Sequence, residues 1–327
     1  MTDEEVVGQL FFVRYPGDDD LAAAWAQSFH LGGYILFGRD FKEDTPEGVR
    51  EKIAACQAAS TVPMLMGVDE EGGSVVRASR YPAFREKKFS SPQTLFAAGG
   101  LEAIQADAAE KSAFLLDLGL NVNLAPVCDV STDPNDFIYD RTLGQDARAT
   151  AEYIAAVVEV MSQEKMGSVL KHFPGYGNNV DTHTGIAQDE RPLTQLQQED
   201  LLPFHSGVEA GAGAVLVSHN IVTCLDSQLP ASLSPAAYGL LRSEVGFEGV
   251  AMTDDLDMDA VKAYVQQGSA AAQAISAGAD MVLTSDPESQ IRQVLSALET
   301  GGLDWGRVRE AALRVLCWKV ELGLIPS

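Results

Sequence analysis

Eight short apolar segments recur along this chain, and each is followed by a polar or glycine-rich loop and then by a helical pattern. Strands that alternate with helices are typical of parallel β-strands joined by crossover helices. Eight such units close naturally into a (β/α)8 barrel of this size. We therefore expect an α/β fold of the TIM-barrel type. The predicted strands span residues 9–13, 33–37, 64–68, 122–126, 168–171, 214–218, 250–253 and 281–284.

The segments between the predicted strands set the domain organisation. An open doubly wound sheet is the alternative, but it predicts a Gly-x-Gly-x-x-Gly loop after the first strand, which this sequence lacks. No Ser/Gly/Pro-rich linker divides the chain, so we expect one domain over residues 1–327. An amphipathic helix at 307–322 is predicted to cover the outside of the barrel. Other helices are predicted at 47–59, 100–119, 150–166, 195–210 and 270–278.

Charge and cysteine content limit the partners and the compartment. A formal charge of −24 argues against nucleic acid and anionic membranes as partners. The four cysteines show no Cys-x-x-Cys spacing, which argues against a zinc site or a disulfide framework and fits a reducing compartment. Residues 1–5 are acidic rather than a basic signal start, and no apolar run approaches a membrane span. We expect a cytoplasmic protein of undetermined oligomeric state.

Residues 171–177, which read Lys-His-Phe-Pro-Gly-Tyr-Gly, follow the fifth predicted strand. Proline and glycine stop any regular element there, so the backbone must form a loop. Farther along are Asp181 and His183, which share one side if the chain is extended. A carboxylate orients an imidazole and favours its protonated form, which gives a proton donor near neutral pH. The alternative is a solvated pair without a catalytic role.

Polar side chains follow several of the predicted strands. Asp69 ends the third strand, Asp129 follows the fourth, Lys171 and His172 end the fifth, and Asp254 follows the seventh. In a barrel these strand ends meet on one face, where catalytic groups of such enzymes lie. A carboxylate fixed there is a candidate nucleophile. Aspartate is also favoured as a helix N-cap, and the sequence alone leaves both roles open for the last of these residues.

Three stretches together resemble the β-N-acetylhexosaminidases of glycoside hydrolase family 3. The first is the 171–177 loop with the following Asp-x-His at 181–183. The second is Val-Asp-Glu-Glu-Gly-Gly-Ser-Val-Val-Arg at 68–77, and the third is Thr-Asp-Asp-Leu-Asp-Met at 253–258. Their order is that of the family, and the resemblance runs from about residue 8 to residue 324. Three long motifs in order are far more specific than any one of them.

The resemblance implies a retaining exo-β-N-acetylglucosaminidase. Asp254 would be the nucleophile, and His183, oriented by Asp181, would be the acid/base. The substrate would be a small carbohydrate, such as a muropeptide or chitin-type fragment with terminal N-acetylglucosamine, in peptidoglycan recycling. Neither a metal nor an organic cofactor is expected. The residues implied in sugar binding are Asp69, Arg77, Arg141, Lys171 and His172.

Some positions depart from the family, and some alternatives stay open. The family commonly has His at position 176, often Asp at 178 and commonly Arg at 74, where this chain has Tyr176, Asn178 and Ser74. These changes bear on the loop and on which aglycone fits. Arg77 and Arg141 could instead be salt-bridge partners. The alternatives for the activity are a β-glucosidase of the same family, an N-acetylglucosaminide phosphorylase and a catalytically idle sugar-binding protein.

Overall fold

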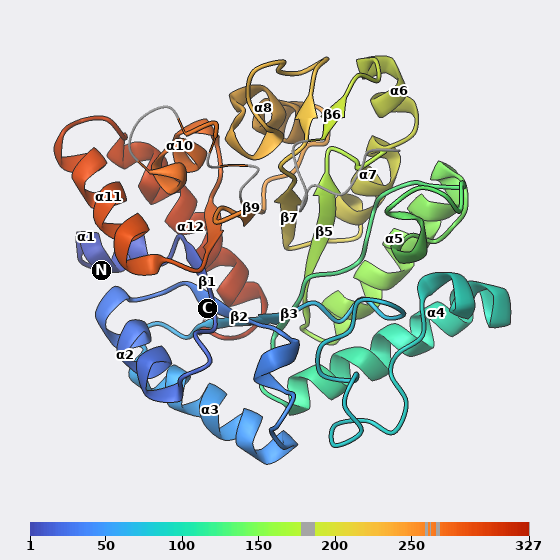
Figure 1. Cartoon of the computed structure of the whole chain (residues 1–327), viewed down its shortest axis with the longest axis horizontal. Helices are drawn as coiled ribbons and strands as arrows, with labels where there is room; N and C mark the ends of the chain where they lie inside the picture. Colours follow the sequence, from blue (N-terminus) through green and yellow to red (C-terminus); the bar gives the residue numbers. More distant parts are fainter. Residues whose placement is uncertain (178–186, 259–260, 262, 266–268, 327) are drawn as a thin grey trace.

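The computed structural model describes residues 1–177, 187–258, 261, 263–265 and 269–326. Its centre is a closed barrel of parallel strands in the order β1-β10-β9-β7-β5-β4-β3-β2 (Figure 1). Each of the eight predicted strands forms one barrel strand, so the predicted (β/α)8 barrel is confirmed. The barrel strands are β1 Phe11–Arg14, β2 Gly33–Leu36, β3 Leu65–Val68, β4 Val122–Asn123, β5 Gly167–Phe173, β7 Ala214–Val217, β9 Val250–Asp255 and β10 Met281–Thr284. We call the end where these strands begin the floor and the end where they finish the mouth.

Helices surround the barrel, and two short strands, β6 Gln188–Asp189 and β8 Ile221–Val222, pair in parallel outside it (Figure 1). Among the described residues, no helix combines the length and apolar character that a membrane span requires. The helices are α1 Asp3–Gly8, α2 Asp19–Phe29, α3 Pro46–Ala59, α4 Pro92–Asp117, α5 Ala147–Gln163, α6 Leu193–Gln198, α7 Leu201–Glu209, α8 Pro235–Ser243, α10 Ala270–Ala277, α11 Pro287–Glu299 and α12 Trp305–Glu321.

The helix predicted at 195–210 is wrong in one respect, because two helices, α6 and α7, occupy this region. The backbone leaves the helical conformation at Glu199, with φ −123° and ψ −71°. The next residue, Asp200, is buried and accepts hydrogen bonds from Arg191 Nη1 at 3.0 and 2.8 Å. A buried carboxylate needs such a partner, and we attribute the break to this tertiary contact, which the local helical pattern does not reveal.

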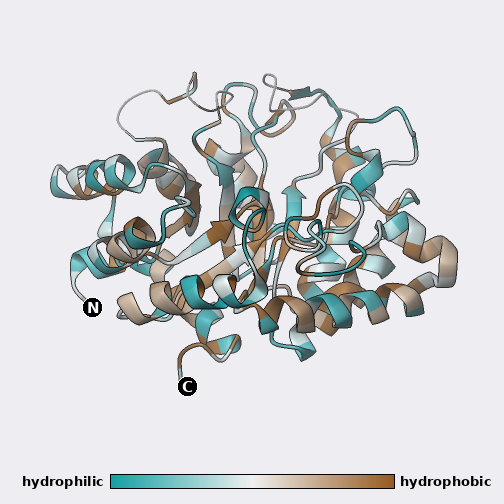
Figure 2. Cartoon of the chain, turned by 60° about the horizontal axis from the view of Figure 1, so that its bottom comes forward, coloured by the Kyte–Doolittle hydropathy of each residue, from teal (hydrophilic) through white to brown (hydrophobic). Residues whose placement is uncertain are grey.

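Side chains alternate between the barrel interior and the helices outside, as the period of a strand requires. Phe12, Val169 and Met252 belong to the interior cluster, whereas their neighbours pack under the helices. The Phe12 ring fits the interior because Gly67 lacks a side chain; a Cβ there would lie 2.5 Å from Phe12 Cζ. Figure 2 shows the resulting contrast between apolar central strands and mixed outer helices.

The last helix, α12, closes the floor of the barrel. We expected it to cover the barrel exterior, but Val315 and Trp318 join the interior cluster. The Trp318 indole packs against Gly167, which begins β5, and against Gly213, which precedes β7. A Cβ on either glycine would collide with the indole. Small residues at the strand starts therefore make the space that the indole fills.

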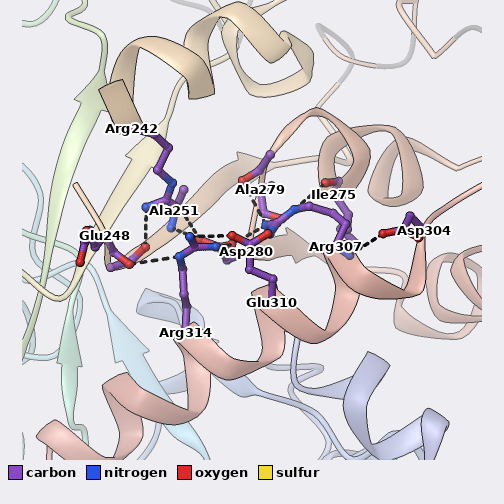
Figure 3. Close-up of polar contacts among 12 residues, drawn as sticks. Arg242, Glu248, Ala251, Ile275, Ala279, Asp280, Asp304, Arg307, Glu310 and Arg314 are labelled. Carbon is purple, nitrogen blue, oxygen red and sulfur yellow. Dashed lines mark hydrogen bonds and ion pairs between the residues drawn. The ribbon is translucent and has the colours of Figure 1, made fainter. Parts of the chain in front are cut away.

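A buried carboxylate ties α12 to the strands near the floor (Figure 3). Asp280 precedes β10 and is fully buried. It accepts hydrogen bonds from Arg242 of α8 and from Arg307 and Arg314 of α12. The backbone N–H of Ala251 also donates to it at 2.9 Å. One carboxylate thus joins two helices to two neighbouring strands.

Replacement of Asp280 by Asn is expected to lower the free energy of unfolding by about 3–5 kcal/mol, because it leaves three arginines without their shared counterion. Urea unfolding measures this change. Asp140→Asn, at an exposed aspartate, is the matched control and should change stability by less than about 0.5 kcal/mol. Equal effects of the two substitutions would contradict the structural role of Asp280.

Lys319 is a buried amine near the floor whose Nζ donates to Gln9 Oε1 at 2.6 Å. Burial lowers its pKa to about 7. Between that value and the ordinary lysine pKa the unfolded chain binds a proton that the folded chain does not, so this group makes stability rise with pH. Below the folded pKa the full penalty of a buried charge applies.

Lys319→Met should therefore stabilise the protein most at low pH. At about pH 6 we expect a gain of about 1–4 kcal/mol in urea unfolding, shrinking as the pH approaches about 9.5. Lys87→Met, at an exposed lysine, should show no such pH dependence. A gain for Lys319→Met that is equal at both pH values would refute the assignment.

Candidate active site

A buried carboxylate, Glu71, connects its own loop to strand β5 and to the loop after β4 at the mouth of the barrel. Its side chain is only 3% exposed, and its Oε1 lies 2.6 Å from Lys171 Nζ of β5. Arg141, in the loop after β4, donates from Nε to Oε2 at 3.0 Å and from Nη2 to Oε1 at 2.8 Å. Burial alone would raise the pKa of Glu71, but these two cations hold it well below its usual range.

The five residues predicted to bind sugar lie in this same network. Asp69 Oδ1 accepts from Lys171 Nζ at 2.8 Å, and Asp69 Oδ2 lies 3.5 Å from Arg77 Nη2. Arg141 Nη2 lies 3.2 Å from His172 Nε2. The fold thus brings all five into one polar array, although they come from three separate parts of the sequence.

Asp129, which is fully buried after β4, orients His172. Its Oδ2 accepts from His172 Nδ1 at 2.7 Å and from the His172 backbone N–H at 3.2 Å. Its Oδ1 accepts from the Tyr176 backbone N–H at 2.7 Å. With Nδ1 as a donor to Asp129, Nε2 is free to accept from Arg141. The same carboxylate therefore fixes the imidazole and the start of the loop that follows.

Asp254 lies near the end of β9 and carries the features of an ionised carboxylate. Burial opposes ionisation, but the neighbouring His219, His172 and Lys171 outweigh it and lower the pKa of Asp254 below its usual value. The backbone N–H of Asp255 contributes by donating to Asp254 Oδ1 at 2.8 Å. Because Lys171 and His172 belong to the polar array, Asp254 lies at the same mouth.

The neighbouring acids of the same segment differ from Asp254. Burial raises the pKa of Asp255 to about 6, and the nearby charges of Asp257 and Asp254 add to that effect. Asp257 Oδ2 accepts from Thr284 Oγ1 at 2.8 Å, which ties this loop to the end of β10. Asp257 thus has a structural role. Because its pKa is raised, Asp255 is less suited than Asp254 to be an ionised nucleophile.

Glu70 supports the turn after β3. Its Oε2 accepts from the backbone N–H groups of Arg77 and Ala78, each at 2.9 Å, and its Oε1 accepts from the Ser79 hydroxyl. Asn123 of β4 holds the Glu70 backbone through bonds of 3.0 and 3.1 Å. This folded turn brings the Arg77 side chain to the mouth.

Sequence reasoning missed the role of Glu71, and it gave Asp129 only a place at a strand end. Glu71 lies two residues after Asp69 in a glycine-containing motif at a strand end, which was the available signal, whereas Asp129 offered only its place after the fourth strand. The predicted acid/base pair, Asp181 and His183, lies outside the described residues, as does Asn178. Tyr176 is buried, with its ring centroid 5.9 Å from that of His172.

The floor also carries a cleft, of about 960 Å³, between α12 and the beginnings of the strands. Its lining includes Lys165, Leu313 and Trp318. We assign the chemistry to the mouth instead, because the ionised Asp254 and the charged array lie there. Among the described residues, no group of three or more His, Cys, Asp or Glu side chains is arranged to hold a metal ion.

Glu71→Gln should reduce stability sharply, because it leaves half-buried Arg141 without its counterion and leaves buried Lys171 with Asp69 alone. We expect a loss of about 3–5 kcal/mol in the free energy of unfolding, measured in urea. Glu86→Gln, at an exposed glutamate in the same loop region, provides the matched control. A loss below about 1 kcal/mol for Glu71→Gln would show that the array does not depend on this carboxylate.

Curated relatives match most of the chain. The profile described as "Glycosyl hydrolase family 3 N terminal domain" matches residues 1–317. A protein of Stenotrophomonas maltophilia named Beta-hexosaminidase is 36% identical over 309 residues, which cover 91% of this chain and 88% of that protein. A Beta-hexosaminidase of Xanthomonas campestris is 34% identical over 270 residues, covering 81% of this chain and 80% of that protein.

Solved structures agree with the sequence comparison. A family 3 glycosyl hydrolase of Mycobacterium smegmatis superposes with a TM-score of 0.87 at 30% identity and covers 97% of both chains. A family 3 β-N-acetylglucosaminidase of Paenibacillus sp. gives a TM-score of 0.91 at 29% identity, over 99% of this chain. This chain spans only 63% of that protein's length. The sequence profile, the relatives and the barrel with its polar mouth lead to one conclusion: the chain belongs to glycoside hydrolase family 3 and is a glycoside hydrolase.

Proposed function

We propose that this enzyme removes terminal N-acetylglucosamine from small β-linked oligosaccharides with retention of configuration. The observation that carries the proposal is the half-buried Asp254 carboxylate near the end of β9, whose pKa its surroundings, Lys171 and His172 among them, lower below the usual value. The names of the relatives support the sugar, since several are Beta-hexosaminidases and one structural neighbour is a β-N-acetylglucosaminidase.

In the proposed mechanism, Asp254 attacks the anomeric carbon while the glycosidic oxygen is protonated and leaves. The product of this step is a covalent glycosyl-enzyme, and water then releases the sugar from the same face. His183, oriented by Asp181, is proposed as the group that donates and later accepts the proton. The resemblance of the Asp-x-His motif supports that assignment.

We propose that Asp69, Arg77, Arg141, Lys171 and His172 bind the sugar. The exposures of three of these side chains support this role, whereas the side chain of Lys171 is only 3% exposed. The side chains of Arg77, Arg141 and Asp69 are 27%, 18% and 14% exposed, whereas that of Glu71, behind them, is only 3% exposed. Charged groups that are held in place and still accessible suit sugar hydroxyls, because a substrate without a hydroxyl leaves them unpaired.

The biological setting is a further part of the proposal. Muropeptide or chitin-type fragments as substrates, peptidoglycan recycling and a cytoplasmic location all rest on the family resemblance. Hydrolysis is favoured over phosphorolysis because the curated relatives are named as hexosaminidases. Products formed from chitobiose with and without phosphate distinguish the two reactions: free sugar supports a hydrolase, and sugar 1-phosphate supports a phosphorylase.

Asp254→Asn is expected to lower kcat for p-nitrophenyl N-acetyl-β-glucosaminide by about a thousandfold or more, because the nucleophile is lost. Asp140→Asn, at the exposed surface, is the control and should retain activity. A fluorinated N-acetylglucosaminide should label Asp254 covalently, as read by peptide mass spectrometry. A label on another side chain would refute the assigned nucleophile, and faster turnover of the aryl glucoside would refute the assigned sugar.

A further inference from the structure

We propose that Arg14, together with Arg77 and the Phe37 ring that both guanidinium groups approach, forms a subsite for an oxyanion on the ligand. This inference rests on the proposed function and adds an acidic ligand group to it. Arg14 was not among the residues that the sequence analysis selected, and it is not part of the Glu71 array.

The strand pattern places Arg14 on the interior face of the mouth. It is the last residue of β1 and comes two residues after Phe12, which belongs to the interior cluster. Its register partner on β2 is Ile35, another member of that cluster. Because side chains alternate along a strand, Arg14 shares the inward face with both residues.

Phe37 joins the two arginines into one surface. The Cζ atom of Arg14 lies 4.5 Å from the centroid of the Phe37 ring, and the Cζ atom of Arg77 lies 5.8 Å from the same centroid. Both distances are within the range of cation–π contacts. Packing of a guanidinium against a ring leaves its N–H edge available to a ligand.

Arg14 differs from the other cations at the mouth because it lacks a counterion. Arg77 pairs with Asp69, and Arg141 pairs with Glu71. Arg14 forms no ion pair or hydrogen bond with any described residue, and its buried Nε has no partner. Burial raises the pKa of both Asp40 and Asp255, and the charge of Arg14 opposes that effect on each, but neither carboxylate pairs directly with Arg14.

An unpaired cation inside the mouth is unexpected in a chain with a net charge of −24, which offers many acidic partners. Arg14 is half-buried, and even partial removal of a charge from water without a partner is costly, so a ligand that supplies the counterion gains from the interaction. A guanidinium matches the paired oxygens of a carboxylate or a phosphate. Two sources have this chemistry, namely a carboxylated sugar and inorganic phosphate.

The test compares two disaccharides that share the same bond and the same non-reducing sugar. Chitobiose is neutral, whereas N-acetylglucosaminyl-β-1,4-N-acetylmuramic acid carries one carboxylate. We expect kcat/KM of the wild type for the acidic disaccharide to exceed that for chitobiose, and Arg14→Met to reduce this preference by about tenfold or more. Arg14→Lys should retain part of it, because the charge remains while the planar fork is lost.

A phosphate titration at constant ionic strength forms the second arm. If inorganic phosphate is the bound oxyanion, it should either inhibit hydrolysis by the wild type or act as the acceptor that forms sugar 1-phosphate. Arg14→Met should abolish that effect. Arg292→Met, at an exposed arginine of α11, is the matched control and should leave both arms unchanged. An Arg14→Met enzyme that keeps both the disaccharide preference and the phosphate effect would overturn the proposal, as would a wild type that shows neither. Failure to cleave any N-acetylglucosaminide would instead refute the proposed function.

Discussion

The arrangement of the mouth depends on one ion cluster, in which the Glu71 carboxylate holds Lys171 and Arg141. These cations come from β5 and from the loop after β4, so the cluster fixes the relative positions of segments far apart in the sequence. Asp69 and His172 then contact the same cations. The charges are matched before any ligand arrives, and the array does not have to reorganise to receive a sugar.

The two ends of the barrel use buried charge for different purposes. At the floor, Asp280 is enclosed by three arginines and no surface of the carboxylate remains for a ligand. At the mouth, Asp69 and Arg77 keep part of their surface exposed while Glu71 behind them is buried. The floor cluster therefore serves stability, and the mouth cluster combines stability with an accessible polar surface.

The strands of the barrel were predictable because each is a short apolar segment followed by a loop, which is a local property of the sequence. The gathering of Asp69, Lys171 and Arg141 followed from the rule that parallel strands finish at one end. The distinct roles of Glu70 and Glu71 were not predictable, since two adjacent glutamates look alike in sequence. The structure shows that one bonds its own turn and the other bonds cations up to a hundred residues away. The roles of the predicted site residues in catalysis and binding stay predictions.

The packing of Trp318 into the barrel floor has an optical consequence. The chain has three tryptophans, of which Trp25 lies on α2 and Trp305 and Trp318 lie on α12. Intrinsic emission therefore reports mainly on the helical shell and the barrel floor, while the mouth contributes tyrosine and phenylalanine. A change in the emission spectrum during unfolding would report the exposure of the Trp318 indole as it leaves its contacts with Gly167 and Gly213. A change on adding a saccharide that binds at the mouth would mean that binding alters the barrel floor or the helical shell.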